Sequence, residues 1–516
     1  MPFLFDQKKS VMSVTQFFEG KSIFITGSSG FIGKVLIEKL LRTCPGIKNI
    51  YILIRPKKNK SIQERVKTMF DVPLFDKLKK GNNDVLNKVL GVPGDITQLN
   101  LGLGEKDTKT ITDNVSIIYH IAASVRFDDF LKIAITTNTR STREIITLAK
   151  QCKTLDVFVY CSTVYCNFEK DVIEEKVYPA KQDWRMAIEL AEKYDEMTLQ
   201  VLTEKCIHPL PNTYTYTKGL TEQLVIDLCT NQIPAIIVRP SIVLPSFEDP
   251  IDGWVDNFNG PMTLNLLAGK GLLKVLKADE EIAHDHVFVD NTVKVLLIAT
   301  WKKSVQADTT IIEVYNNATD VNFSPLFDRE VGNKVVSKNP PESYLWYAYT
   351  EFIKNPIIFY IGTLFYHLLP ALILDSIMYL TGKKPKIFKL YRKVFIANVS
   401  LYPFMSKAFN IRTENYLGLE ESLMECDKKE LSFINSRMPA DSTRTVKAIH
   451  IIWKGIKQYL MKEKAYATEE EIKRYARIMT FQKMLYFVVK GFIFYLIISK
   501  LLVPVIISEL NKISSI

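Results

Sequence analysis

The stretch "NTYTYTKGLTEQLV", residues 212–225, contains two tyrosines and a lysine at a spacing suited to proton transfer. Residues four apart lie on one face of a helix, whereas residues two apart do not. Tyr214 precedes Lys218 by four residues, and Tyr216 precedes it by only two. Because a lysine charge favours the phenolate, we expect Lys218 to lower the pKa of Tyr214 and make it a general acid. Tyr216 is interpreted as a packing aromatic.

A carbonyl that receives hydride needs a second hydrogen-bond donor beside the tyrosine. The segment "YCSTVYCN" follows an apolar run and supplies Ser162 and Thr163. Adjacent strand residues face opposite ways, so only one of these hydroxyls should face the reacting carbonyl. We favour Ser162 and keep Thr163 as the alternative.

The segment "ITGSSGFIGKVL" has the spacing GxxGxxG between an expected strand and an expected helix. Glycines there allow a tight turn and a close approach of the backbone to a pyrophosphate, whose charge meets the helix N-terminus. This context predicts dinucleotide binding. The residues expected to contact the cofactor are Thr26, Gly27, Ser29, Gly30, Phe31, Ile32 and Gly33.

The next expected strand ends in "LIRPKKNK", which contains Arg55, Lys57 and Lys58 and no acid. An acidic residue at this place would bind the ribose of NAD, whereas a cation pairs with the 2′-phosphate of NADP. The segment therefore favours NADPH, with Arg55 closest to the strand end. The alternative is an ordinary solvated basic loop.

Two further segments suit a dinucleotide site. In "GVPGDIT", Asp95 stands at an expected strand end, where it would bind the adenine amino group or simply cap a turn. In "YHIAASVRF", Ala122 and Ala123 are small enough for a flat cofactor to pass closely, although ordinary close packing would also explain them.

These residues require a scaffold of buried strands and covering helices. Apolar runs at 21–27, 49–56, 115–123, 156–163 and 234–243 alternate with helical stretches such as 31–42. Strands that are apolar on both faces suit a parallel sheet covered by helices. We therefore predict an α/β fold, a Rossmann-like doubly wound parallel sheet, followed by a mostly helical C-terminal domain.

Two later segments are apolar enough to meet a membrane. Residues 355–374 carry no formal charge, and residues 485–510 are interrupted only by Lys490, Lys500 and Glu509 before the segment ends. The first segment is close to the ~20 residues that cross a bilayer. It could span the membrane, form an interfacial hairpin or line a cavity for a greasy ligand. We interpret the second as a C-terminal anchor, with a membrane-surface or core helix as alternatives.

The composition excludes several classes. The seven cysteines form no CxxC pair and the six histidines form no HExxH motif, so we expect neither a disulfide framework nor a metal site. The N-terminal residues lack the apolar core of a signal peptide. The formal charge of +11 suits anionic ligands or membranes.

In combination, these segments resemble an alcohol-forming fatty acyl-CoA reductase of the extended short-chain dehydrogenase/reductase superfamily. The resemblance also rests on "HIAASVRFDD", "IVRPSIV", "GWVDNFNGP" and "YHLLPALILDSIMYLTGKKPKIFKLYRKV", and it is looser over the last 120 residues or so. It implies two NADPH-dependent reductions of a long-chain acyl-CoA, through an aldehyde to the alcohol, with release of CoA. It also implies that Lys218 holds the nicotinamide ribose and that Arg239 and Pro240 shape the nicotinamide end.

The sequence departs from this family at Gly219, where alanine is usual, at Tyr216, where phenylalanine is usual, and in lacking expected tryptophans near residues 404–423. Two other readings remain. One is a membrane-bound relative that acts on sterol or sugar alcohols, and the other is a membrane scaffold that binds NADPH without turnover.

The expected organisation is an N-terminal extension (1–20), a reductase domain (21–330), an apolar membrane or acyl-lining segment (331–390), a helical domain (391–480) and an anchor (481–516). The expected partners are long-chain acyl-CoA and membrane lipid, and nucleic acid is not expected. The endoplasmic reticulum membrane, with the catalytic domain in the cytosol, is the expected location, and the peroxisomal membrane is the alternative. The sequence leaves the oligomeric state open.

Overall fold

The computed structural model describes residues 12–81, 83–282, 284–319, 329–434, 442–499 and 504. The chain divides into two compact units. The first comprises residues 1–258, 279–325 and 399–455, and the second comprises 259–278, 326–398 and 456–516. These units do not follow the linear limits expected from sequence, because residues 259–278 group with the second unit and residues 399–455 with the first. Most of the N-terminal extension and the end of the expected anchor lie outside the described residues.

Among the described residues, the first unit is built on a seven-stranded sheet of order β11-β7-β5-β4-β1-β2-β3, in which all neighbouring strands are parallel. Its strands are β1 (Ser22–Thr26), β2 (Asn49–Ile54), β3 (Val89–Pro93), β4 (Ile117–His120), β5 (Val157–Cys161), β7 (Ala235–Pro240) and β11 (Glu313–Asn317). The predicted Rossmann-like fold is confirmed, and the five predicted strands each contain one of these elements.

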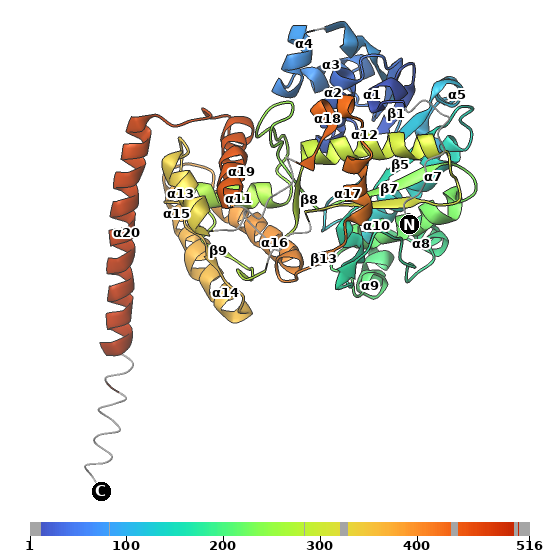
Figure 1. The fold of residues 1–516 in the computed structure, drawn as a ribbon. Helices are drawn as coiled ribbons and strands as arrows, with labels where there is room; N and C mark the ends of the chain where they lie inside the picture. The colour runs from blue at the N-terminus through green and yellow to red at the C-terminus, as the bar shows by residue number, and fades with distance from the viewer. Residues whose placement is uncertain are drawn as a thin grey trace. The chain divides into compact units, whose positions relative to one another are not determined.

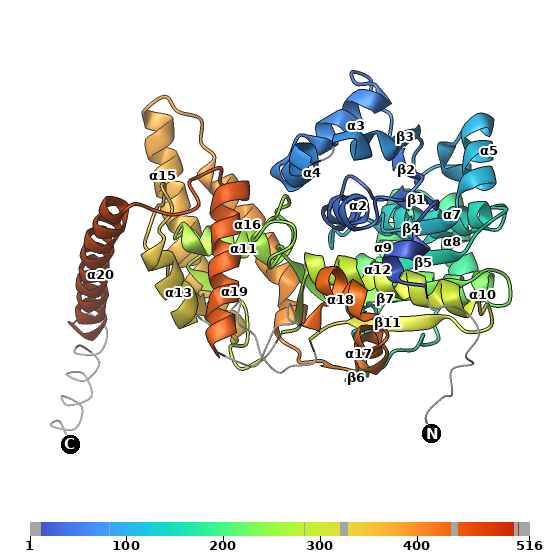
Figure 2. The same cartoon turned by 45° about the horizontal axis from the view of Figure 1, so that its top comes forward.

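Helices cover both faces of this sheet, as Figures 1 and 2 show. The helices of the first unit include α1 (Val14–Phe17), α2 (Phe31–Thr43), α3 (Ile62–Phe70), α4 (Asp76–Gly81), α5 (Glu105–Asn114), α6 (Leu131–Ala134), α7 (Ser141–Ala149), α8 (Trp184–Lys193), α9 (Glu196–Ile207), α10 (Thr213–Cys229), α12 (Val289–Gln306), α17 (Glu414–Glu421), α18 (Glu425–Leu431) and α19 (Ser442–Gly455).

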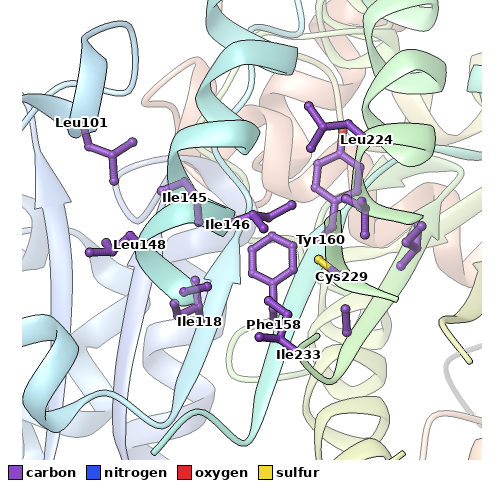
Figure 3. Close-up of a cluster of buried hydrophobic side chains, with 14 of the residues drawn as sticks. Leu101, Ile118, Ile145, Ile146, Leu148, Phe158, Tyr160, Leu224, Cys229 and Ile233 are labelled. Carbon is purple, nitrogen blue, oxygen red and sulfur yellow. The ribbon is translucent and has the colours of Figure 1, made fainter. Parts of the chain in front are cut away.

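The core of the first unit follows the pleat of the strands. Successive side chains of a strand point to opposite faces, and both faces are buried here. Ile118 of β4 and Phe158 of β5 join a cluster with Ile145 and Ile146 of α7 and Leu224 of α10 (Figure 3). The strands are therefore fixed in register by apolar packing on each side.

The chain order of the strands reverses between β1 and β4, which are neighbours in the sheet. Ligands of doubly wound sheets bind outside the carboxyl ends of the strands at such a switch point. The glycine-rich loop leaves β1 there, and the segments with Arg55, Asp95, Ala122 and Ser162 leave the neighbouring strands at the same edge.

The second unit is mostly helical, as predicted for the later part of the chain. It contains α11 (Pro261–Gly269), α13 (Arg329–Lys338), α14 (Pro356–Thr363), a π-helical turn (Leu364–Leu368), α15 (Leu369–Leu380), most of α16 (Ile387–Met405) and α20 (Glu469–Ile497). A short parallel pair, β9 (Val275–Leu276) and β12 (Glu351–Phe352), lies among them.

Candidate active site

The glycine-rich loop passes close to the backbone that follows β4. Gly27 has a φ of +76°, and a Cβ built there would lie 2.6 Å from the backbone nitrogen of Ala122. A Cβ on Gly33 would collide with the carbonyl oxygen of Gly27, whereas one on Gly30 would lie 3.1 Å from it. Close backbone packing therefore requires glycine at positions 27 and 33. At position 27 the positive φ requires glycine as well.

Helix α2 begins at Phe31, directly after this loop. Its N-cap is Gly30, which has no side chain to accept hydrogen bonds from the first amides of the helix. The amides of Phe31, Ile32 and Gly33 thus form a helix N-terminus suited to an anion. The uncapped helix and the glycine cradle fit the pyrophosphate of a dinucleotide.

Thr26 contacts the protein interior through its side chain. Its Oγ1 lies 2.7 Å from Nδ1 of His120, and His120 Nε2 lies 2.9 Å from Oγ1 of Thr142. Burial, with the charge of Lys218, lowers the pKa of His120 to about 3, so the imidazole is neutral at pH 7. The Thr26 side chain supports the loop from beneath, which leaves only its backbone for a cofactor contact.

A basic cavity of about 610 Å³ lies beside the phosphate loop. The wall includes Ser29 from the loop and five cationic residues, and its full lining is Ser29, Lys34, Lys57, Lys58, Asn59, Lys60, Arg65, Thr68 and Met69. This concentration of positive charge suits a phosphate group. Lys57, which was predicted from sequence, lies in this wall, but Arg55 does not.

Arg55 instead forms an ion pair with Asp95. Its Nε lies 2.9 Å from one carboxylate oxygen and its Nη2 lies 3.2 Å from the other. Asp95 also accepts hydrogen bonds from the backbone and the hydroxyl of Thr97, so it caps a turn. The turn interpretation of Asp95 is thus observed, and its contact with adenine stays a prediction.

Tyr214 and Thr163 meet at the carboxyl end of β5. The Thr163 hydroxyl lies close enough to the Tyr214 phenol to oppose, in small part, the rise in the pKa of that phenol. Thr163 also contacts the carbonyl of Pro240 at 3.3 Å, so the end of β7 reaches the same place. The Ser162 hydroxyl donates a hydrogen bond to the sulfur of Cys166 at 3.8 Å. Thr163 is thus the hydroxyl that acts on the phenol in this structure, and the choice of Ser162 or Thr163 as the catalytic hydroxyl stays a prediction.

The expected lowering of the Tyr214 pKa is wrong for this structure. Burial of the phenol raises its pKa, with smaller contributions in the same direction from Cys161 and Cys166. The Lys218 ammonium donates a hydrogen bond to the carbonyl of Cys161 at 2.5 Å and lies 4.7 Å from the centre of the Tyr160 ring. Burial lowers the pKa of Lys218 itself.

Arg239 is fully buried and pairs with Glu222 on α10. Its Nε and Nη2 donate to the two carboxylate oxygens at 2.7 and 2.6 Å, and further bonds go to the carbonyls of Glu174 and Lys176. This guanidinium holds α10 against β7, one helical turn beyond Lys218. Its side-chain contacts do not support the role at the nicotinamide that the resemblance implied, and that role stays a prediction.

Several residues of the site were not identified from sequence. Asn138, in a π-helical segment (Ile135–Arg140), bonds the backbone of Ser124 and the hydroxyl of Thr217, which precedes Lys218. Arg65 and Lys34 reach the basic cavity from α3 and α2. The capping box formed by Ser61 and Glu64 is recognisable in the sequence and predicts that α3 starts there. That prediction would have placed Arg65 near the start of this helix, beside the basic loop.

An aromatic cluster adjoins Tyr214. The Phe127 ring lies 6.0 Å from that of Tyr214 and stacks at 5.2 Å on Phe404. Tyr165, Phe168 and Phe409 complete the cluster. The Tyr214 phenol is thus bordered by apolar rings on one side and by the polar strand ends on the other.

Two family models match the chain, both described as "Male sterility protein", over residues 25–296 and 366–463. Fatty acyl-CoA reductase 1 of Rattus norvegicus is 36% identical, with 90% of this chain and 87% of that protein covered. The Homo sapiens protein of the same name is 35% identical over the same shares. Fatty acyl-CoA reductase wat of Drosophila melanogaster is 34% identical, covering 92% and 91%.

Solved structures share the fold. The terminal R domain from the myxalamid PKS-NRPS biosynthetic pathway has a TM-score of 0.57 at 17% identity, covering 87% of this chain and 93% of its own. The reductase domain of a nonribosomal peptide synthetase from Mycobacterium tuberculosis has a TM-score of 0.55 at 14% identity, covering 85% and 92%.

Proposed function

Because the chain belongs to the fatty acyl-CoA reductase family, we propose that it reduces long-chain fatty acyl-CoA to the fatty alcohol through an aldehyde, with release of CoA. The observation that carries this proposal is the meeting of Tyr214 and Thr163 at the sheet edge that also holds the glycine cradle. That arrangement supports a role for Tyr214 as proton donor to a substrate carbonyl that would face a nicotinamide cofactor.

NADPH, when bound, supplies one hydride to each of the two reductions. The backbone of Gly27, Gly30 and Gly33 and the first amides of α2 would hold its pyrophosphate. Lys57, Lys58 and Arg65 line the cavity beside Ser29 and would hold its 2′-phosphate.

Tyr214 would deliver the proton that accompanies each hydride to the carbonyl oxygen. Its raised pKa keeps the phenol protonated at neutral pH, which a donor requires. The Thr163 hydroxyl lies next to the phenol and would hold the same oxygen as negative charge develops on it. Lys218, fixed at the carbonyl of Cys161, would hold the nicotinamide ribose beside that oxygen.

The protein would act at a membrane, where the acyl chains of its substrate concentrate. We propose the endoplasmic reticulum, with the first unit in the cytosol and residues 481–516 as the anchor, and the peroxisomal membrane as the alternative. The positive charge of +11 also suits the phosphates of CoA and an anionic membrane surface.

Product analysis by mass spectrometry tests this function. Purified full-length protein would be incubated with NADPH and acyl-CoAs of different chain length and unsaturation. We expect fatty alcohol and free CoA, with two NADPH oxidised per alcohol. Tight NADPH binding without acyl-CoA-dependent oxidation would instead identify a non-catalytic scaffold, and accumulation of aldehyde would show that the second reduction does not occur.

A further inference from the structure

The apolar run Pro356–Leu380 is the one helical segment of the described residues that is long and apolar enough to cross a membrane by length and composition. It consists of α14, the π-helical turn and α15, and its two faces differ. The buried side chains lie on one stripe with a spacing of about four residues: Phe359, Thr363, His367 and Ala371.

This stripe packs against other elements of the second unit. The ring of His367, midway along the run, accepts a hydrogen bond from the backbone nitrogen of Lys274 at 2.9 Å and stacks on Tyr391 of α16 at 4.9 Å. Gly362 approaches β9, since a Cβ there would lie 3.1 Å from a methyl group of Val275. The middle of the run is therefore a packed part of the protein.

The opposite face is exposed and consists of large apolar side chains. Ile357 is 69% exposed, Phe365 60% and Ile373 61%. The face also includes Ile358, Ile361, Leu364, Leu369, Leu372, Ile377 and Leu380. A contiguous apolar face of this size marks an interaction surface.

The turn after the run is held to the same unit. Asp375 accepts hydrogen bonds from the backbone amides of Lys386, Ile387 and Phe388, each at 2.9 Å, and so begins α16. Farther along α16, Asn398 accepts from the backbone of Lys277 and donates to the carbonyl of Val275. The helices on both sides of the turn are thus connected to β9, α14 through Gly362 and α16 through Asn398.

Exposed cations border the apolar face at this turn and along the start of α16. They are Lys383, Lys384, Lys386, Lys389, Arg392 and Lys393. Lysine and arginine beside an apolar surface suit the headgroups of anionic lipids.

We propose that Pro356–Leu380 lies in the plane of the membrane, with its exposed face in one leaflet and its buried stripe on the protein. A spanning helix would have lipid around it and would place the turn at Lys383 on the far side of the bilayer. That position would break the contacts of His367 and would separate α16 from β9. The inference rests on the membrane location proposed above, but not on the reductase activity.

Helix α20 contacts this surface and continues it. The hydroxyls of Tyr366 and Tyr486 lie 3.4 Å apart, and Figure 1 shows α20 on the same side as α14 and α15. Phe481, Met484, Phe487 and Val488 of α20 are exposed as well. The surface is therefore continuous with the segment that begins the proposed anchor, which places both at one membrane.

Glycosylation mapping of the full chain in microsomes tests the topology. A flexible loop with an Asn-x-Thr acceptor would be inserted between Gly382 and Lys383, and the same loop would be appended after Ile516 in a second protein. We expect no glycan at 382–383, and a glycan there would overturn the proposal. The appended loop reports the C-terminal anchor separately, because it is modified only if that anchor crosses the membrane.

Lipid photolabelling distinguishes the in-plane helix from a lining of the acyl cavity. In vesicles that contain a diazirine phospholipid and an anionic lipid, mass spectrometry should find label on Ile357, Ile361 and Phe365 and little on Phe359 or His367. Met197 and Val201 of α9, which are 71% and 84% exposed, provide matched apolar controls that should stay unlabelled. A run labelled no more than these controls would contradict the proposal.

A double substitution on the exposed face tests the same proposal through loss of the lipid label. Ile361→Asp with Phe365→Asp should remove most of the label from the run, while Met197→Asp with Val201→Asp should leave it unchanged. NADPH oxidation measured on each variant tests the reductase function independently, so a failure of either proposal is recognised separately.

Discussion

The two tyrosines of α10 are two residues apart and have different surroundings. Tyr214 meets Thr163 at the ends of the strands, whereas Tyr216 is buried on another side of the helix and donates a hydrogen bond to Oε1 of Gln182. Each loses one hydroxyl on substitution by phenylalanine, so the pair forms a matched comparison of a proposed proton donor with a structural phenol.

Tyr214→Phe should lower kcat by about 10²- to 10⁴-fold, the usual contribution of a general acid, and leave NADPH affinity nearly unchanged. Tyr216→Phe should keep near-normal turnover and reduce stability by about 1 kcal/mol, the net value of one hydrogen bond. Steady-state kinetics, cofactor fluorescence titration and thermal melting measure these effects. An inactive Tyr216→Phe beside an active Tyr214→Phe would reverse the assignment.

His120 provides a pH-dependent contribution to stability. Its pKa is about 3 in the folded protein and about 6.5 when unfolded, so its contribution is complete above pH 6.5 and is lost as the pH falls toward 3. At pH 5.5 the loss is about 1.4 kcal/mol. Wild type should therefore lose about that much more stability than His120→Gln between pH 7.5 and 5.5 in denaturant unfolding. Equal losses in both proteins would contradict the buried neutral state.

At the scale of elements, the β1–α2 connection depends on backbone contact between two loops. Gly27 and Gly33 leave space only for hydrogen, and the loop they form presents the first amides of α2 to a ligand. A methyl group at Gly33 must push the loop away from the helix.

Gly33→Ala should weaken NADPH binding by at least tenfold, because the amides that hold the pyrophosphate would be displaced. Gly81→Ala is the matched control, since a Cβ there meets no atom within 4 Å. Isothermal titration of both variants measures the difference. Unchanged affinity in Gly33→Ala would show that the loop does not hold the cofactor.

The contact of α10 with β7 depends on the buried pair of Glu222 and Arg239. Removing one partner leaves the other charge buried and should cost about 3–5 kcal/mol, as in Glu222→Ala. Replacing both by apolar residues of similar size, as in Glu222→Leu with Arg239→Met, should recover much of this loss. Denaturant unfolding of the single and double variants measures the coupling, and simple addition of two losses would show that the pair is not coupled.

On the scale of the whole molecule, the candidate active site and the proposed membrane contacts belong to different compact units. The strand ends and the basic cavity lie in the first unit, and Pro356–Leu380 and α20 lie in the second. The second unit therefore carries both proposed membrane contacts, the in-plane helix and the C-terminal anchor.

Deletion of residues 485–516 should change the type of membrane binding. The truncated protein should remain on anionic membranes through the in-plane helix and its cations, but high salt or carbonate should extract it, since screening weakens such binding. The full chain should resist both treatments. Sedimentation of membranes with immunoblotting distinguishes these outcomes, and complete release at low salt would show that the C-terminal segment is the sole attachment.

The local patterns of the sequence determined the scaffold and the composition of the site. Strands buried on both faces, the GxxGxxG spacing and the four-residue separation of Tyr214 and Lys218 follow from short-range periodicity, which is read directly from the chain. These features predicted the doubly wound sheet and the place of the glycines, Tyr214, Ser162 and Thr163 at one edge, and the choice between the two hydroxyls stays a prediction.

The tertiary structure decided which partners the charged and polar groups take. Lys218 binds the carbonyl of Cys161, Arg239 pairs with Glu222, and Arg55 pairs with Asp95, and none of these pairs is close in sequence. Burial raises the pKa of Tyr214 because desolvation of the phenolate depends on neighbours from distant segments. For the same reason hydropathy alone left the orientation of Pro356–Leu380 open, and the contacts of His367 with Lys274 and Tyr391 distinguish its two faces.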